Sequence, residues 1–155
     1  MTNVIKMPVH GKPRKEWGQT SAKKWGSDVM DRGFCIVPSI LIRAQTRIGL
    51  TTTQLVIILN LIDWWIDPSR SPWSSKKDLS DRIGIKPRQL QRQIAELEKA
   101  GLVKRIERTN HNGKIPNEYD LQGLVEKLEK LAPEFKKAAG ANSEVEKSLS
   151  RRTKV

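Results

Sequence analysis

The chain has 155 residues, which is enough for one domain with a hydrophobic core and two tails, or for two very small domains. It carries 29 Lys and Arg residues against 17 Asp and Glu residues, and the net charge of +12 favours a polyanionic partner, nucleic acid before an anionic membrane. The single cysteine, Cys35, excludes an internal disulfide, and its apolar neighbours predict a buried, unreactive thiol. The N-terminus lacks an apolar signal region, and no apolar run reaches the roughly 20 residues of a membrane span, so we expect a cytoplasmic protein.

Residues 1–33 are expected to form a basic, largely disordered N-terminal arm, because they are polar and broken by glycine and proline. Two tryptophans stand in similar surroundings, Trp17 and Trp25, each preceded by a charged pair and followed by glycine. Each tryptophan either docks on the folded domain or contacts a partner. Docking is favoured for Trp25, which lies closer to the folded domain, whereas neither role is favoured for Trp17. The basic segment Gly11–Lys15 is compatible with a minor-groove arm, although any basic tail containing proline would match as well.

The folded domain is expected over residues 34–131 and begins with two helices. The first, about 38–47, stops before Gly49, and the second, about 52–66, is capped by Thr51 or Thr52. The second helix is apolar almost all round and carries two stripes: Leu55, Ile58, Leu59, Ile62 and Ile66 on one side, and Ile57, Leu61 and Trp64 on another. One amphipathic face needs only one stripe, so a neighbouring helix or a second protomer must cover the other.

The segment from Ser75 to Gly101 predicts two short helices, about 75–83 and 87–100, joined by a tight turn. Gly84 can adopt the left-handed conformation that ends a helix, and Pro87 suits a first helical position. Apolar residues at i, i+4 and i+7 form one buried stripe of the second helix, and the opposite side carries Arg and Gln near its start. The stripe consists of Leu90, Ile94 and Leu97. Such a helix fits a DNA recognition helix; the alternative is an ordinary helical hairpin with a solvated basic face.

A two-stranded hairpin, about 102–121, is expected to follow, with Asn112-Gly113 as its tight turn. Pro116 favours an edge position for the returning strand, because proline cannot donate a ladder hydrogen bond. Trp73 is a candidate start of a further short strand. Leucines at helical spacing then predict a helix over about 122–131, closed by Pro133, and residues 132–155 are expected to be a basic, disordered tail. The leucines are Leu124, Leu128 and Leu131.

This order of elements resembles a winged helix-turn-helix domain over residues 37–131, a mainly α (α+β) fold. The motif Asp78–Ile106 is similar to the pattern shared by many bacterial winged-helix regulators. More narrowly, the chain resembles bacterial proteins in which a Trp-Gly pair (Trp25-Gly26) precedes a Val-Pro pair (Val37-Pro38), and in which a Trp-rich helix precedes Ser75–Leu79. A Tyr-Asp-Leu element, Tyr119–Leu121, follows the wing. Such proteins are similar to small transcription regulators and to winged-helix modules of plasmid replication initiators.

The resemblance implies roles for three groups of residues, each of which could also be plain solvated surface. The base-reading group in the major groove would be Lys86, Arg88, Gln89, Gln91 and Arg92. Arg can donate two hydrogen bonds to guanine, and Gln can pair with adenine. Phosphate contacts would come from Ser75, Lys76 and Lys77 at a helix start, where free N–H groups favour an anion. The wing residues on the DNA backbone or minor groove would be Arg108, Asn110, His111, Asn112 and Lys114.

We therefore expect a sequence-specific double-stranded DNA-binding protein of the bacterial cytoplasm, associated with the nucleoid and regulating transcription. The alternatives are a plasmid or phage replication-initiator or partition module, and a protein-interaction adaptor. A homodimer is expected through the helices containing Leu55–Ile66, Leu124–Leu131 or both, because their apolar surface needs covering. The sequence holds no catalytic constellation, zinc-ligand spacing or phosphate-binding loop, so neither an enzyme nor a cofactor or small-molecule ligand is expected.

Overall fold

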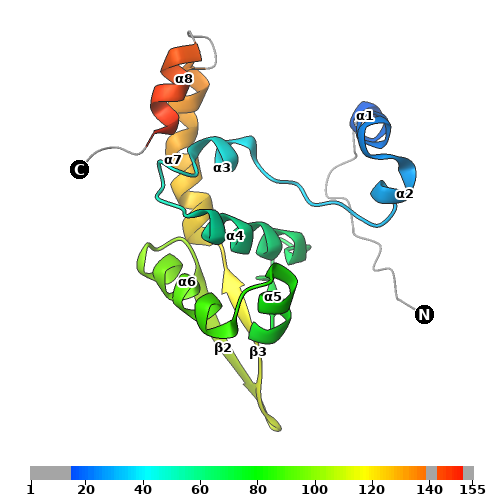
Figure 1. Cartoon of the computed structure of the whole chain (residues 1–155), viewed down its shortest axis with the longest axis vertical. Coiled ribbons are helices and arrows are strands. Elements are labelled where there is room, and N and C mark those ends of the chain that lie inside the picture. Colours follow the sequence, from blue (N-terminus) through cyan, green and yellow to red (C-terminus); the bar gives the residue numbers. More distant parts are fainter. Residues whose placement is uncertain (1–14, 139–142, 152–155) are drawn as a thin grey trace. The chain divides into compact units, whose positions relative to one another are not determined.

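The computed structural model describes residues 15–138 and 143–151, with only the backbone described at 15–19 and 143–146. The chain divides after Ile36 into two compact units. The first contains α1 (Lys15–Trp25) and α2 (Ser27–Met30), so this part of the arm is helical where the sequence predicted disorder (Figure 1). Gly18 is expected to break the chain here but lies inside α1. A single glycine costs a helix only about 1 kcal/mol relative to alanine, so the helix can continue through it. Residues 11–14 of the proposed minor-groove segment, and the side chains of Lys15 and Trp17, lie outside the described residues.

The end of the first unit is apolar and exposed. Phe34, Cys35 and Ile36 all face solvent within the unit, and Trp25 is exposed there as well. The predicted buried thiol is therefore wrong: the apolar run that suggested burial does not enter a hydrophobic core of its own unit.

The second unit is a mixed α+β domain, which confirms the expected winged-helix-like fold. In chain order it contains α3 (Ser39–Ala44), α4 (Thr52–Trp64), β1 (Trp73–Ser74), α5 (Lys76–Ile83), α6 (Pro87–Lys99), β2 (Lys104–Asn110), β3 (Gly113–Asp120), α7 (Gln122–Ala138) and α8 (Ser143–Ser150). Figure 1 shows α4, α5 and α6 grouped beside the β2–β3 hairpin. No helix in the described part of the chain is long and apolar enough to cross a lipid bilayer.

Helix α4 is fixed at its start by a reciprocal cap and buries one face. The Thr51 hydroxyl accepts a hydrogen bond from the Gln54 amide (3.2 Å), and the Gln54 side-chain oxygen accepts one from the Thr51 amide (3.0 Å). The buried positions follow helical spacing: Gln54, Ile57, Ile58 and Leu61. This face mixes the two predicted stripes. The remaining apolar positions of α4 are only half-buried: Leu55, Val56, Leu59, Ile62 and Trp64.

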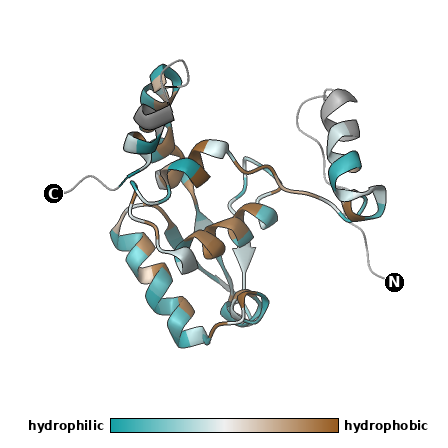
Figure 2. Ribbon diagram, turned by 45° about the horizontal axis from the view of Figure 1, so that its top comes forward, coloured by the Kyte–Doolittle hydropathy of each residue, from teal (hydrophilic) through white to brown (hydrophobic). Residues whose placement is uncertain are grey.

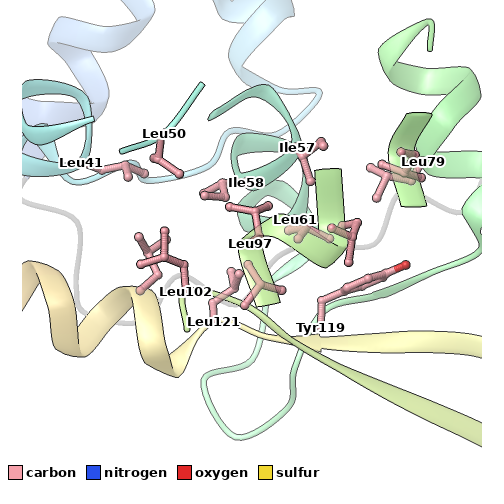
Figure 3. Close-up of a cluster of buried hydrophobic side chains, with 14 of the residues drawn as sticks. Leu41, Leu50, Ile57, Ile58, Leu61, Leu79, Leu97, Leu102, Tyr119 and Leu121 are labelled. Carbon is pink, nitrogen blue, oxygen red and sulfur yellow. The ribbon is translucent and has the colours of Figure 1, made fainter. Parts of the chain in front are cut away.

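The hydrophobic core lies between α4, α5, α6, the sheet and the start of α7. Figure 3 shows side chains from these elements converging, among them Ile58 and Leu61 from α4, Leu97 from α6 and Tyr119 from β3. Leu124 and Leu128 of α7 belong to the same buried cluster. Figure 2 shows the contrast that results from this packing: α4 is largely hydrophobic, whereas α6 is largely hydrophilic.

The C-terminal helices extend the domain beyond the predicted end at residue 131. Helix α7 continues through Pro133 to Ala138, because Leu131 and Phe135 are buried against Ala44 of α3 in a second cluster that Leu149 of α8 also contacts. Arg47 links both helices: its guanidinium contacts Glu134 Oε2 at 2.6 Å and donates to the Leu149 carbonyl at 3.4 Å. The expected disordered tail is thus helical over 132–138 and 143–150.

The sheet is antiparallel, with β3 between β1 and β2. The short strand expected at Trp73 is confirmed, but the edge position expected for the strand containing Pro116 is wrong, because β3 is central. Strand β1 pairs only with Asn117 and Glu118, and the β2–β3 register shifts between Ile106 and Arg108. Pro116 lies at this β-bulge, where its missing N–H costs no regular ladder hydrogen bond.

Candidate nucleic-acid interface

The two-helix unit has the local geometry that its sequence predicts. Gly84 ends α5 in the left-handed conformation (φ +81°), and the amides of Gly84 and Ile85 both donate to the Ser80 carbonyl at 2.9 and 3.1 Å. Pro87 opens α6, whose buried face consists of the predicted stripe, Leu90, Ile94 and Leu97. The outward face of α6 is thereby fixed.

Most of the predicted base-reading residues lie together on that outward face, over the first two turns of α6. Lys86, Arg88, Gln91 and Arg92 are exposed, and Gln89 is half-buried. Among the residues that the structure describes, no carboxylate forms an ion pair with Lys86, Arg88 or Arg92. Three such cations on one short helical face are well suited to bind a polyanion.

The acidic residues of α6 point to its two flanks instead. Glu96 Oε2 accepts a hydrogen bond from Gln54 Nε2 of α4 at 3.1 Å. Glu98 Oε1 accepts from the Arg105 amide of β2 at 3.1 Å and lies 3.8 Å from the Arg105 guanidinium. These contacts tie α6 to α4 on one side and to the sheet on the other, so they orient the helix and keep negative charge off its outward face. Sequence reasoning missed Gln54 and Arg105, for which only the capping position of Gln54 gave a signal.

The predicted phosphate-binding residues are adjacent at the start of α5, but two of them are already engaged. The Ser75 hydroxyl accepts from the Asp78 amide (3.0 Å) and donates to Asp78 Oδ2 (2.6 Å), so Asp78 supplies the negative charge that this helix start favours. Lys77 Nζ contacts Asp81 Oδ2 at 2.5 Å, and this hydrogen bond raises the pKa of the Lys77 ammonium. Lys76 is exposed and has no ion pair within the described part of the chain, which leaves it as the strongest phosphate candidate of the three.

At the wing, the structure gathers the predicted residues around the hairpin tip. Asn110 pairs with Gly113, so His111 and Asn112 form the loop, and the Asn110 side-chain oxygen accepts from the Asn112 amide at 2.9 Å. The turn is thus one residue earlier than the predicted Asn112-Gly113 pair, with Gly113 at φ +113°. The tip residues Asn110, His111 and Asn112 are exposed.

The two predicted wing cations differ in availability. Arg108 is half-buried and its Nε lies 3.1 Å from Glu118 Oε1. Lys114 is exposed and only loosely paired with Glu107, at 3.9 Å. The wing therefore offers Lys114 and the polar tip to a partner more readily than Arg108. Within the described residues, no group of three or more His, Cys, Asp or Glu side chains is placed to hold a metal ion.

A protein-family model described as the DnaD N-terminal domain matches residues 37–139. The match begins at the first residue of the second unit and ends one residue after α7. It therefore includes α6, the wing and the helix that follows the wing. No curated protein matches the chain.

Proposed function

The chain belongs to the DnaD N-terminal domain family, a DnaD-like family of replication proteins with a winged-helix-like fold, and on this premise we propose that it is a sequence-reading DNA-binding module of a replication system. The first interpretation of the sequence, transcription regulation, gains no support from the family match. The alternative interpretation, a replication-initiator module, is the one that the match favours.

The observation that carries the proposal is the uncommitted positive charge of Lys86, Arg88 and Arg92 on the outward face of α6. With α6 in the major groove, Arg88 and Arg92 would each donate two hydrogen bonds to a guanine, and Gln91 would pair with an adenine. A good bidentate pair of this kind gives about 1–3 kcal/mol of discrimination against the wrong base. The module itself would carry out no chemical step.

The remaining contacts would fix the position of the module on the duplex. Lys76 would bind a phosphate near the start of α5, and Lys114 with the tip residues Asn110, His111 and Asn112 would follow the backbone or the minor groove. These contacts carry no sequence information by themselves, so they would contribute equally to specific and random DNA.

Of the two helix surfaces expected to form the homodimer contact, only the one on α4 remains a candidate. The leucines Leu124, Leu128 and Leu131 of α7 are buried within their own unit, so they are not available for a partner. The half-buried residues of α4, such as Val56 and Leu59, remain as the proposed contact between protomers. A second copy bound this way would match DNA sites that are repeated or palindromic.

The experiment is selection of bound duplexes from a random pool with the full chain, followed by anisotropy titration of the selected duplex and a scrambled one. Arg88→Ala or Arg92→Ala should relax base preference at defined positions and weaken the selected duplex by about 5- to 150-fold. Lys127→Ala, which removes an exposed positive charge from α7, is the control and should leave base preference unchanged.

Two results would count against the proposal. An equal loss on selected and scrambled duplex for the α6 variants would show that α6 contacts only phosphates. Duplex binding whose affinity does not fall with salt would point to a protein-interaction adaptor, because each neutralised phosphate should lower the slope of log affinity against log salt by about 0.9.

A further inference from the structure

The outer face of the sheet carries two large exposed apolar side chains in one row. Trp73 of β1 and Ile106 of β2 are both register partners of Glu118 in the central strand. Trp73 is 60% exposed and Ile106 is 36% exposed. Neighbouring strands lie about 4.8 Å apart, so the two side chains stand roughly 10 Å apart on either side of Glu118.

Strand alternation explains why this row faces away from the core. Tyr119, next to Glu118, is 1% exposed and points into the core, and Ser74, next to Trp73, is also buried. Trp73 and Ile106 must therefore face the opposite side of the sheet. The fold gains little from an indole that remains mostly in water, so the exposed ring of Trp73 is available to a ligand.

Exposed cations lie on this face and close to it along the chain. Arg70 and Lys76, each three residues from Trp73 along the chain, are both exposed. On β2, Lys104 and Arg108 lie two residues to either side of Ile106 and so share its face.

The two acidic side chains of the same face are already engaged. Glu118 is paired with Arg108 at 3.1 Å. Asp120 is the register partner of Lys104, and its carboxylate accepts a hydrogen bond from the Gln122 amide at 2.8 Å. Among the residues that the structure describes, Arg70, Lys76 and Lys104 form no ion pair, whereas the two carboxylates are ion-paired or hydrogen-bonded. A polyanion at this face would therefore meet cations that have no carboxylate partner there.

We propose that this face, defined by Trp73, Ile106 and Lys104, binds single-stranded DNA together with the neighbouring cations Arg70 and Lys76. One base stacks on the indole of Trp73 and the next packs on Ile106, while the three cations contact phosphates. The ligand is single-stranded because base faces in a duplex are covered by their neighbours, whereas an unpaired base offers its face to an aromatic side chain. The site goes beyond the proposed reading of duplex DNA by α6 and uses different residues, except that both sites include Lys76.

The test titrates the full chain with a fluorescein-labelled twelve-nucleotide oligothymidine and, separately, with a selected duplex. Trp73→Ala should weaken binding of the oligothymidine by about 5- to 150-fold, the loss expected for one stacked base, and leave duplex affinity unchanged. Trp73→Phe should retain most of the affinity, because the aromatic face remains. Arg88→Ala should show the opposite pattern, which separates failure of this proposal from failure of the α6 proposal.

A second measurement does not depend on a folded variant. Irradiation of the wild-type chain with an oligothymidine carrying one 5-iododeoxyuridine should give a crosslink that maps to the peptide containing Trp73. A crosslink confined to α6, unchanged oligothymidine affinity in a folded Trp73→Ala variant, or equal losses on single strand and duplex would each overturn the proposal. Light scattering gives a further outcome that would overturn it. If Trp73→Ala changed the molecular mass of the protein in solution but kept its affinity for the single strand, the face would be a contact between protein chains.

Discussion

Replacing Gly123 by alanine should destabilise the domain, although the same change in an exposed helix normally stabilises it. Gly123 lies in the first turn of α7, where the helix touches the turn between α6 and β2. A Cβ at this position would lie 2.0 Å from the Gly101 carbonyl oxygen and 3.1 Å from its carbon. Both are backbone atoms, so no side chain can move aside to make room.

The magnitude follows from two opposing effects. Glycine to alanine in an unconstrained helix gains about 1 kcal/mol. Forcing an extra methyl group into a filled space usually costs about 1–3 kcal/mol, and here the shift also strains the hydrogen bond from the Leu124 amide to the Leu102 carbonyl, which is 3.0 Å long. Because the clash is with backbone atoms, we place the cost in the upper part of this range, at about 2–3 kcal/mol. After the gain of about 1 kcal/mol, we expect a net loss of about 1–2 kcal/mol of unfolding free energy, which corresponds to a fall of roughly 3–10 °C in Tm for a domain of this size.

Thermal and urea unfolding followed by circular dichroism would measure the change in Gly123→Ala. Gln122→Ala, at the exposed preceding residue, is the matched control and should change the unfolding free energy by less than about 0.5 kcal/mol. An increase in Tm for Gly123→Ala would refute the reasoning, because it would mean that α7 does not approach Gly101 as closely as described.

Three further predictions concern charge and burial. Glu98→Ala removes the acceptor of the Arg105 amide and should lower the unfolding free energy by about 1–2 kcal/mol; an unchanged urea midpoint would show that this bond does not hold α6 to the sheet. Asp81→Asn releases Lys77 and should raise duplex affinity while steepening the salt dependence by about one unit, as measured by anisotropy from 50 to 200 mM salt; an unchanged slope would remove Lys77 from the phosphate contacts. Burial raises the pKa of Tyr119 above its usual 10.0, with hydrogen bonding to Asn117 opposing it, so its contribution to stability is complete below pH 10 and is lost at higher pH. Urea unfolding between pH 8 and 11 should show a smaller high-pH loss for Tyr119→Phe than for the wild type, and equal losses would contradict that role.

The two-helix unit could be predicted from sequence because its signals are local. Gly84, Pro87 and the spacing of Leu90, Ile94 and Leu97 act over a few residues, and they determine which side of α6 is buried. The predicted cations on the outward face follow from the same geometry. The sequence could not predict that these cations form no ion pair within the described part of the chain, because this depends on Glu96 and Glu98 contacting α4 and β2 instead.

The differences arise where distant contacts decide the outcome. The sequence predicts a helix end at Pro133, but the burial of Leu131 and Phe135 against α3 compensates for one lost backbone hydrogen bond. Pro116 predicts an edge strand, whereas a bulge accommodates it in the central strand. Lys77 has the composition of a phosphate ligand, and only its distance of 2.5 Å to Asp81 shows that the charge is already paired.

The bulge at Pro116 also divides the hairpin mechanically. Below it, β3 is held on both sides, by β1 and β2; beyond it, β2 and β3 continue as a two-stranded ribbon to the tip. Two-stranded ribbons twist more strongly than wider sheets, and a bulge adds to the local bend. The tip can therefore coil to follow a curved surface while Trp73 and Ile106 stay on the stiffer base. One hairpin thus has a flexible two-stranded tip and a stiffer three-stranded base, and Pro116 marks the boundary between them.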